Sequence, residues 1–314
     1  MNWHALATYD RRGEQRAALV LGHEQFDVAE AAAARGDERL PALAKGVWVA
    51  LQEWDTAGPA IAQLARDVPR LVGSGDMRAL TDAALSGPSL RPPFLPVRIF
   101  AAGSNYREHA AEMGTALAPR SETAPYVFMK ADSSVIGPGA EVRMPKTSQK
   151  VDWEVELAVV IGRGGRHISE ADALSHVAGY TIINDVSARD LTRRADYPFT
   201  FDWLRGKGFD TFGPLGQWLV PAACLPDPQN LRLTLAVNGV MMQDGTTASM
   251  IFSIAEQIAY LSSIATLRPG DVIATGTPAG VGMGRGTFLR AGDVMTATIE
   301  HIGVLENPVV DARD

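Results

Sequence analysis

The hydrophobic pattern of this chain is densest in residues 151–162, where β-branched and other apolar side chains surround two acidic ones. Such a composition predicts a β-strand. Because successive side chains of a strand point to opposite faces, Glu154 and Glu156 share one face while Trp153 and Val155 share the other. The glutamate face then becomes apolar, so the two carboxylates stand where the strand enters a core. A solvated edge on an amphipathic strand would show the same alternation, since charged side chains are seldom buried without a partner.

Upstream of this strand, the pattern predicts a small α+β unit. Residues 5–22 read as a hairpin with a polar turn. Residues 28–71 are rich in alanine and leucine with mostly helical spacing, which Gly46 and Gly58-Pro59 interrupt. Four prolines and a glycine between residues 86 and 96 exclude a helix or a central strand and indicate a linker.

After the linker, short apolar runs and turn signals follow one another closely, which is typical of a β-rich domain. Asn238-Gly239 between two apolar runs predicts a type I′ hairpin. Two helices are expected, over residues 169–177 and over residues 253–267, the second opening with a capping box. The chain is thus predicted to be α+β and β-rich, with a small N-terminal domain at residues 1–90 and a larger domain at 97–314.

Composition narrows the class of partner. The chain has 314 residues, of which 46% are hydrophobic and 21% charged, an ordinary globular mixture. A net charge of -7 argues against nucleic acid as the main partner, because phosphate binding requires clustered Lys and Arg. No apolar stretch approaches a membrane span, the N-terminus lacks a signal-peptide pattern, and the single Cys224 excludes an internal disulfide. We therefore expect a cytoplasmic protein without membrane partners.

Three acidic residues are candidates for a metal site. Residues 179–185 form a second apolar run, which ends in Asp185. Neighbouring carboxylates in a partly dry site repel each other, and a bound cation removes that repulsion. Together, Glu154, Glu156 and Asp185 would supply half of the octahedral oxygen shell of an ion such as Mg2+, with water and substrate completing it. Asp185 could equally serve as the cap of the next element.

A histidine and a glutamate follow the apolar run at residues 97–102. His109 and Glu112 are three residues apart and are therefore neighbours on one helix face. A carboxylate beside an imidazole fixes its tautomer and raises its basicity, as a water-activating base requires. A weak surface ion pair on an exposed helix is the alternative.

Two later segments offer further polar side chains. Lys207 lies in a glycine-dense, loop-like stretch, where it could stabilise an enolate or simply be solvated. Residues 274–286 contain many glycines, but the dinucleotide-binding order fails at Arg285 and no helical pattern follows. Thr277 and nearby N–H groups could instead bind a carboxylate at a strand end, or form a plain turn. The sequence has neither a Cys-x-x-Cys pair nor a Gly-x-Ser-x-Gly elbow.

Taken together and in this order, these segments resemble the fumarylacetoacetate hydrolase family over about residues 99–309. The motifs that carry the resemblance are Gly103-x-Asn105-Tyr106-x-x-His109-x-x-Glu112, Phe128-x-Lys130, Asp152-x-Glu154-x-Glu156-Leu157, Asn184-Asp185-x-Ser187-Ala188-Arg189-Asp190, Lys207-Gly208-Phe209-Asp210, Asn238-Gly239 with Gln243-Asp244-Gly245, and Gly276-Thr277-Pro278-x-Gly280-Val281-Gly282. Each motif is weak alone, but seven in order are specific.

The resemblance implies a mixed β-roll domain that forms a homodimer and binds Mg2+ or Mn2+. It assigns the metal to Glu154, Glu156 and Asp185, a water-activating dyad to His109 and Glu112, and oxyanion support to Lys207. It makes Arg107, Lys130, Arg189 and Thr277 the candidate substrate-binding residues. The implied substrates are small 2-oxo or 2,4-dioxo acids, acylpyruvate-like or derived from sugar acids.

The implied reaction is metal-dependent hydrolysis of a C–C bond in a 2,4-dioxo acid, giving a pyruvate-type product. Decarboxylation or isomerisation of a 2-oxo acid on the same metal site is the alternative, and non-catalytic binding of small dicarboxylates is a third. The sequence departs from many relatives after Asp190, where Leu191-Thr192 replaces a usual glutamine. Arg193 and Arg194 follow, which suggests an additional anionic or hydroxylated group on the substrate.

Overall fold

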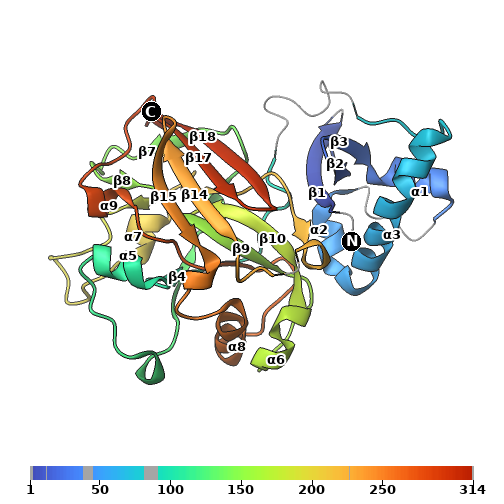
Figure 1. Ribbon diagram of the computed structural model, residues 1–314. Coiled ribbons are helices and arrows are strands. Elements are labelled where there is room, and N and C mark those ends of the chain that lie inside the picture. Colours follow the sequence, from blue (N-terminus) through green and yellow to red (C-terminus); the bar gives the residue numbers. More distant parts are fainter. Residues whose placement is uncertain (1–2, 12, 38–44, 81–90, 226, 313–314) are drawn as a thin grey trace.

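The structure is a computed structural model, and it describes residues 3–11, 13–37, 45–80, 91–225 and 227–312 (Figure 1). The last ten residues of the N-terminal domain predicted at 1–90, residues 81–90, lie outside the described residues. The linker predicted at 86–96 is described only from residue 91. The remaining elements place an N-terminal α+β unit beside a larger β-rich body.

The N-terminal unit contains the predicted hairpin, extended by a third strand. It consists of the antiparallel strands β1 (Ala5–Arg11), β2 (Glu14–Leu21) and β3 (Glu24–Asp27), followed by the helices α1 (Val28–Arg35), α2 (Val47–Gln52) and α3 (Trp54–Gly73). The break predicted at Gly58-Pro59 is wrong, because both residues lie inside α3. A proline removes one helical hydrogen bond, but the buried apolar face of α3, which includes Ile61 and Leu64, stabilises the helix by packing.

The larger body is built from two sheets. One has six strands in the order β13 (Val220–Pro221), β10 (Val177–Asn184), β9 (Val155–Ile161), β16 (Val272–Ala274), β4 (Ile99–Gly103) and β5 (Tyr126–Lys130). The other has five, in the order β15 (Val240–Thr246), β14 (Arg232–Val237), β17 (Val294–Ile299), β18 (Gly303–Asp311) and β7 (Val142–Met144). Most pairs are antiparallel, but β16 runs parallel to β4 and β18 parallel to β7, so the sheets are mixed.

Shorter elements complete this body. They are the strand pairs β8 (Val151–Asp152) with β11 (Ser187–Ala188) and β6 (Val135–Ile136) with β12 (Gly213–Pro214), and the helices α5 (Arg107–Glu112), α6 (Glu170–Ala173), α7 (Trp203–Lys207), α8 (Ile254–Ile264) and α9 (Gly282–Arg285). The predicted α+β, β-rich class is confirmed.

The strand at the centre of the fold shows the expected alternation. The single strand predicted over residues 151–162 is divided into β8 and β9, with Trp153 and Glu154 between them. From Trp153 onward, alternate residues enter the apolar cluster shared with the five-stranded sheet, whereas Ala158 and Val160 enter a second cluster on the other face. Figure 1 shows the orange and red strands of the five-stranded sheet in front of β9 and β10.

The second face of the six-stranded sheet packs against the N-terminal unit. Ala158 and Val160 share their cluster with Leu64 and Val68 of α3, and Leu6 exchanges two backbone hydrogen bonds with Leu219. Apolar packing is thus continuous between the two parts of the chain. The division into domains at residues 1–90 and 97–314 stays a prediction.

The predicted helices and hairpin are largely confirmed. Asn238 and Gly239 have φ values of 52° and 76° and join β14 to β15, as a type I′ turn requires. Helix α8 opens with the predicted capping box. The helix predicted over residues 169–177 is confirmed to within one residue at its end. Ser169 caps α6, a 3-10 turn over Leu174–His176 continues it, and β10 begins at Val177. Gly179 lies inside β10, where a Cβ would overlap the Val220 carbonyl group.

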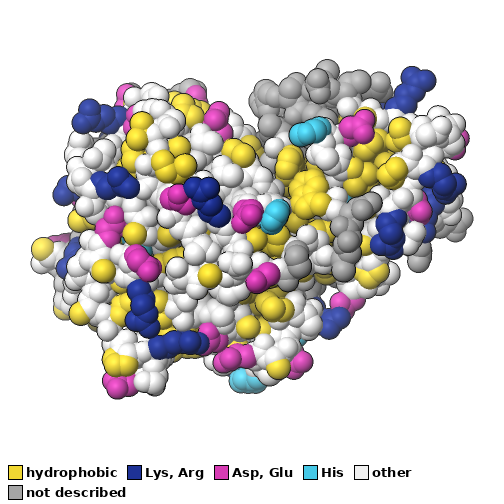
Figure 2. All heavy atoms as spheres, viewed as in Figure 1, with side chains coloured by type: hydrophobic (Ala, Val, Ile, Leu, Met, Phe, Trp, Pro, Cys, Tyr) yellow, Lys and Arg dark blue, Asp and Glu magenta, His cyan; other side chains and the backbone are white. Residues whose placement is uncertain are grey.

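Two surface features bear on the predicted partners. Basic and acidic side chains are interspersed on the face shown in Figure 2. Among the described helices, none combines the length and the apolar character that crossing a membrane requires.

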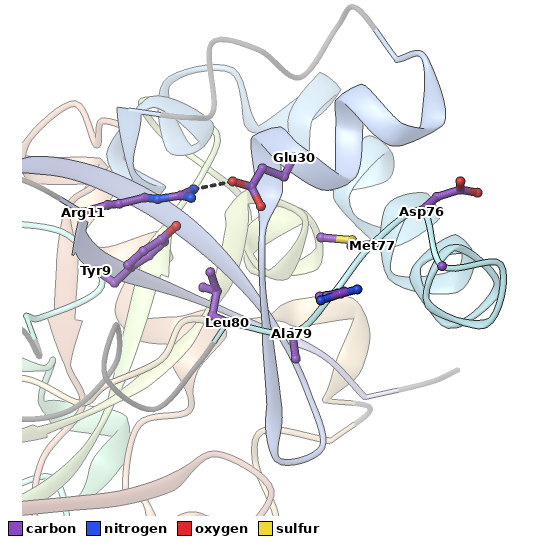
Figure 3. Close-up of a pocket in the computed structure, with 9 residues that line it drawn as sticks. Tyr9, Arg11, Glu30, Asp76, Met77, Ala79 and Leu80 are labelled. Atoms are coloured by element: carbon purple, nitrogen blue, oxygen red, sulfur yellow. Dashed lines mark hydrogen bonds and ion pairs between the residues drawn. The ribbon is translucent and has the colours of Figure 1, made fainter.

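A cavity of about 560 Å³ opens in the N-terminal unit beside Tyr9, Leu80 and the Arg11–Glu30 ion pair (Figure 3). None of the predicted site residues lines it.

Candidate metal centre and active site

The three predicted metal ligands converge. Glu154 lies between β8 and β9, Glu156 lies in β9, and Asp185 directly follows β10. The antiparallel pairing of β9 with β10 brings the two ends together, and the Asp185 N–H donates to the Glu154 carbonyl oxygen at 2.9 Å. One carboxylate oxygen from each residue lies within 4.8 Å of the others, and all three residues are buried. The solvated-edge alternative for Glu154 and Glu156 is therefore excluded.

Three buried cations surround this carboxylate cluster. Lys207 Nζ donates to Glu154 Oε2 at 2.6 Å and also to Asp185 Oδ2. Lys130 Nζ lies 2.6 Å from Asp185 Oδ1, outside hydrogen-bond geometry, and donates to the Lys207 carbonyl oxygen at 2.7 Å. Arg189 Nη2 donates to Glu154 Oε1. Lys207 is not in a loop, as the glycine-rich pattern suggested, but ends helix α7.

The charges act unequally on the three carboxylates. Burial alone would raise the pKa of Glu154, but Arg189 and Lys207 outweigh burial and hold that pKa well below its usual range. Burial, followed by repulsion from Asp185 and Glu154, raises the pKa of Glu156 well above its usual value. Among the described residues, Glu156 is the one member of the cluster that makes no ion pair.

This arrangement fits a divalent cation. Hard cations bind carboxylate oxygens, and the cluster offers one from each of three residues on two strand ends. A cation bound there would stabilise the ionised form of Glu156, whose pKa is raised by burial and by the neighbouring carboxylates. Glu154, Glu156 and Asp185 are therefore the residues that could hold a metal ion.

The predicted dyad lies beside the cluster. His109 and Glu112 are both on α5, and His109 Nδ1 is 3.7 Å from Glu112 Oε2, beyond hydrogen-bond distance but within reach of an ion pair. His109 is 5% exposed and close enough to Glu154 to lower its pKa, so the surface-pair alternative fails. Burial would raise the pKa of Glu112, but His109 and the Gly280 N–H outweigh burial and lower it.

The glycine-rich segment after β16 binds carboxylates through its backbone. The Gly276 N–H donates to Glu156 Oε2 at 2.8 Å, and the Gly280 N–H donates to both oxygens of Glu112 at 3.0 and 3.1 Å. The expectation that no helix follows is wrong, since α9 begins at Gly282. Its first N–H groups are occupied by the protein's own carboxylate, because Gly282 and Met283 donate to Asp152 at 2.6 and 2.9 Å.

The predicted substrate contacts differ in exposure. Arg107 is exposed, whereas the side chains of Lys130 and Arg189 are buried and already paired with site carboxylates. The Thr277 hydroxyl donates to the Val155 carbonyl oxygen at 2.9 Å, so its donor supports the sheet. A substrate contact by any of the four residues, Arg107, Lys130, Arg189 and Thr277, stays a prediction.

A row of stacked aromatic side chains connects the loop before α7, residues 193–202, with the carboxylate cluster. Phe201 stacks on Trp203 with ring centroids 5.5 Å apart, and Trp203 stacks on Phe128 at 4.9 Å. Arg193 lies 4.8 Å from the Phe201 centroid at one end, and Lys207 Nζ lies 5.1 Å from the Phe128 centroid at the other. The stack therefore connects an exposed guanidinium with the buried ammonium.

Sequence reasoning assigned no role to several residues that organise the site. Asp152 is fully buried and binds Arg189. Gln243 is also fully buried, accepts from the Val155 N–H at 3.0 Å and donates to Thr277 Oγ1 at 2.8 Å. Asn184 Oδ1 accepts from the Glu154 N–H at 2.9 Å. Asp152 shares the alternation of Glu154 and Glu156, a signal that was present in the sequence.

Comparison with known proteins identifies the family. The family model described as "Fumarylacetoacetate (FAA) hydrolase C-terminal" matches residues 98–310. The chain belongs to the fumarylacetoacetate hydrolase family. The chain is 46% identical over 223 residues to the human oxaloacetate tautomerase FAHD2A, mitochondrial, which covers 70% of this chain and 69% of that relative.

Two solved structures of the family extend the likeness to almost the whole chain. The fumarylacetoacetate hydrolase of the psychrophilic Exiguobacterium antarcticum has a TM-score of 0.77 and 30% identity, covering 98% of this chain and 100% of its own. The maleylpyruvate hydrolase of Sphingobium sp. SYK-6, in complex with manganese(II) and pyruvate, has a TM-score of 0.73 and 27% identity over 98% and 100%. The predicted fumarylacetoacetate hydrolase fold and the prediction of an enzyme of this family are confirmed.

Proposed function

We propose that this protein is a divalent-metal-dependent hydrolase that cleaves the C–C bond between positions 3 and 4 of a 2,4-dioxo acid. The observation that carries the proposal is the dyad of a buried histidine and a partly buried glutamate beside a buried carboxylate cluster. The dyad histidine lies next to the cluster, and its partner glutamate is fixed by the Gly280 N–H. The manganese and pyruvate bound by the related maleylpyruvate hydrolase support the same class of ion and product.

Each group would have a defined part in the reaction. The metal ion would be Mg2+ or Mn2+, held by Glu154, Glu156 and Asp185, and it would supply Lewis-acid polarisation of the 2-oxo group. His109 presents Nδ1 to Glu112, so its Nε2 would accept a proton from water. The water oxygen bonds to C4, the C3–C4 bond breaks, and C3 takes up a proton. The products are a carboxylic acid and a pyruvate-type 2-oxo acid.

Lys207 would stabilise the negative charge that develops on the enolate oxygen. Burial would lower its pKa, but the charges of Asp185 and Glu154 outweigh burial and raise it, so the ammonium stays protonated. A fixed positive charge in a water-poor site stabilises a developing anion more than it would in water.

The test is a panel of acylpyruvates assayed with Mn2+ and the full chain in 18O-labelled water. Hydrolysis places the label in the released carboxylic acid. We expect His109→Ala to lower the rate of cleavage by about 10²–10⁴-fold, the usual contribution of a general base, while Mn2+ binding is kept. Glu156→Ala should abolish Mn2+ binding. Cleavage by His109→Ala at the wild-type rate would refute the proposal.

Tautomerisation or decarboxylation of an oxaloacetate-like acid is the second candidate, and the 46% identity to an oxaloacetate tautomerase favours it. These reactions need no water nucleophile. His109→Ala should therefore spare them, and the label from water should not appear in a new carboxylic acid. A homodimer and a cytoplasmic location stay predictions, which light scattering and cell fractionation can test.

A further inference from the structure

The carboxylate of Asp152 stands between the two halves of the site, the metal cluster and the dyad. It is fully buried and accepts four hydrogen bonds. Oδ1 accepts from the Trp153 N–H at 2.8 Å and the Gly282 N–H at 2.6 Å. Oδ2 accepts from Arg189 Nε at 2.8 Å and the Met283 N–H at 2.9 Å. Both oxygens are thus saturated by the protein, so this carboxylate is organised to hold other groups.

One side of this network leads to the metal cluster. The guanidinium of Arg189 binds Asp152 through Nε and Glu154 Oε1 through Nη2. The planar guanidinium presents these two N–H donors in a fixed relative orientation, one for each carboxylate, which the single ammonium group of a lysine does not. Burial would lower the pKa of Arg189, but the charges of Glu154 and Asp152 outweigh burial and raise it, so the guanidinium stays charged. The orientation of Glu154 therefore depends on Asp152.

The other side of the network leads to the dyad. Asp152 binds the N–H groups of Gly282 and Met283 at the start of α9. The same segment carries Gly280, whose N–H binds the Glu112 carboxylate and whose carbonyl oxygen accepts from Trp153 Nε1 at 3.1 Å. The position of Glu112, and through it of His109, therefore depends on the segment that Asp152 anchors.

We propose that Asp152 is a positioning residue that couples the two halves of the site. Through Arg189 it orients Glu154 for the metal ion, and through the start of α9 it holds the backbone that grips Glu112. The inference deepens the proposed function and rests on it. It predicts that one isosteric change, at a residue that touches neither metal nor substrate, disturbs both metal binding and water activation.

Asp152→Asn is the decisive variant, because it keeps the shape of the side chain but removes its negative charge. It also replaces one acceptor oxygen by an NH2 donor, although all four partners of this carboxylate are donors. We expect the Mn2+ Kd, measured by titration of the full chain without substrate, to rise about 10–100-fold, as loss of a partner behind a metal ligand usually causes. At saturating Mn2+, kcat for cleavage should still fall at least about 10-fold, since Glu112 loses its anchor.

Two further variants separate positioning from a general loss of stability. Arg189→Lys keeps the charge but lacks the two separate donors, Nε and Nη2, through which Arg189 binds Asp152 and Glu154. It should raise the Mn2+ Kd while kcat at saturating Mn2+ changes less than in Asp152→Asn. The matched control is Asp271→Asn, which changes an equally buried aspartate that is paired with Arg98 directly before β16 and makes no contact with the cluster residues among the described interactions. It should leave the Mn2+ Kd unchanged.

The outcomes distinguish this inference from the proposed function. If wild-type protein binds no Mn2+, both are overturned. If wild type binds Mn2+ and Asp152→Asn binds it with the same Kd, the coupling role alone is overturned. Should Asp152→Asn fail to fold, Arg189→Lys carries the test, and an unchanged Mn2+ Kd in that variant refutes the link to Glu154.

Discussion

A methyl group at Gly284 should separate water activation from metal binding. Gly284 lies in α9 directly against Glu112, and a Cβ there would overlap Cγ, Cδ and Oε1 of that side chain. Carbon atoms in contact stand about 3.5–4.0 Å apart, so Glu112 would have to move by roughly 1–2 Å. The overlapping atoms belong to a flexible side chain rather than to backbone. The fold should therefore accept Gly284→Ala, which also favours helix slightly.

The displaced Glu112 would lose its contacts with the Gly280 N–H and its alignment with His109. A misplacement of about 1 Å in a catalytic group lowers a rate by about 10²-fold. We therefore expect kcat for cleavage to fall about 100-fold in Gly284→Ala, equivalent to about 2.7 kcal/mol of activation free energy. The Mn2+ Kd and the free energy of unfolding should stay near the wild-type values.

The assay is steady-state cleavage of an acylpyruvate at saturating Mn2+, with Mn2+ titration in parallel. Met283→Ala is the matched control, since its side chain is 43% exposed on the same helix and its N–H still reaches Asp152. A kcat for Gly284→Ala within about threefold of wild type would refute the role of Glu112. A large loss of Mn2+ affinity would show that α9 moves instead of Glu112, and this would contradict the expectation that the substitution affects water activation alone.

The remaining predictions concern stability. Burial would raise the pKa of Asp27, but the hydrogen bond from Arg16 is among the effects that outweigh burial and lower this pKa. The ionised Asp27 therefore contributes its full stabilisation above about pH 4, and this contribution is lost as the pH falls through the folded-state pKa. Urea unfolding at about pH 7 and about pH 3 should therefore show a smaller difference in stability for Asp27→Asn than for wild type, and equal differences would contradict the assignment. Ile258→Ala, at a fully buried position of α8, should lower the free energy of unfolding by about 2–5 kcal/mol in the same assay, and a loss below about 1 kcal/mol would show that the site collapses around the smaller side chain. Ser253→Ala removes the side chain that caps the Glu256 N–H and should destabilise by about 1 kcal/mol, with an unchanged urea midpoint arguing that the cap is not stabilising.

Local chemistry made several features predictable from the sequence. The alternation around Glu154 and Glu156, the type I′ turn at Asn238-Gly239 and the capping box at Ser253 depend on residues a few positions apart. Their geometry is set by backbone dihedrals and by hydrogen bonds within the segment. The family was also predictable, because seven short motifs that occur in the same order as in the family are specific together even though each is weak alone.

Features that depend on packing were predicted poorly. Gly58-Pro59 should interrupt a helix in isolation, yet α3 continues through it because its apolar face is buried. Lys207 follows a pattern typical of a loop and instead ends a helix with a buried side chain. In each case long-range burial outweighs local propensity.

The sequence by itself determined which side chains could bind a metal and activate water, because this depends on the chemical types of the residues and on their spacing along the chain. Only the tertiary structure decided that Glu112 is held by Gly280, 168 residues away, and that Asp152 joins Arg189 to the start of α9. The physical reason is that such contacts are made between strand ends and loops distant in sequence. Their partners are fixed by the pairing of the sheets, which no local pattern specifies.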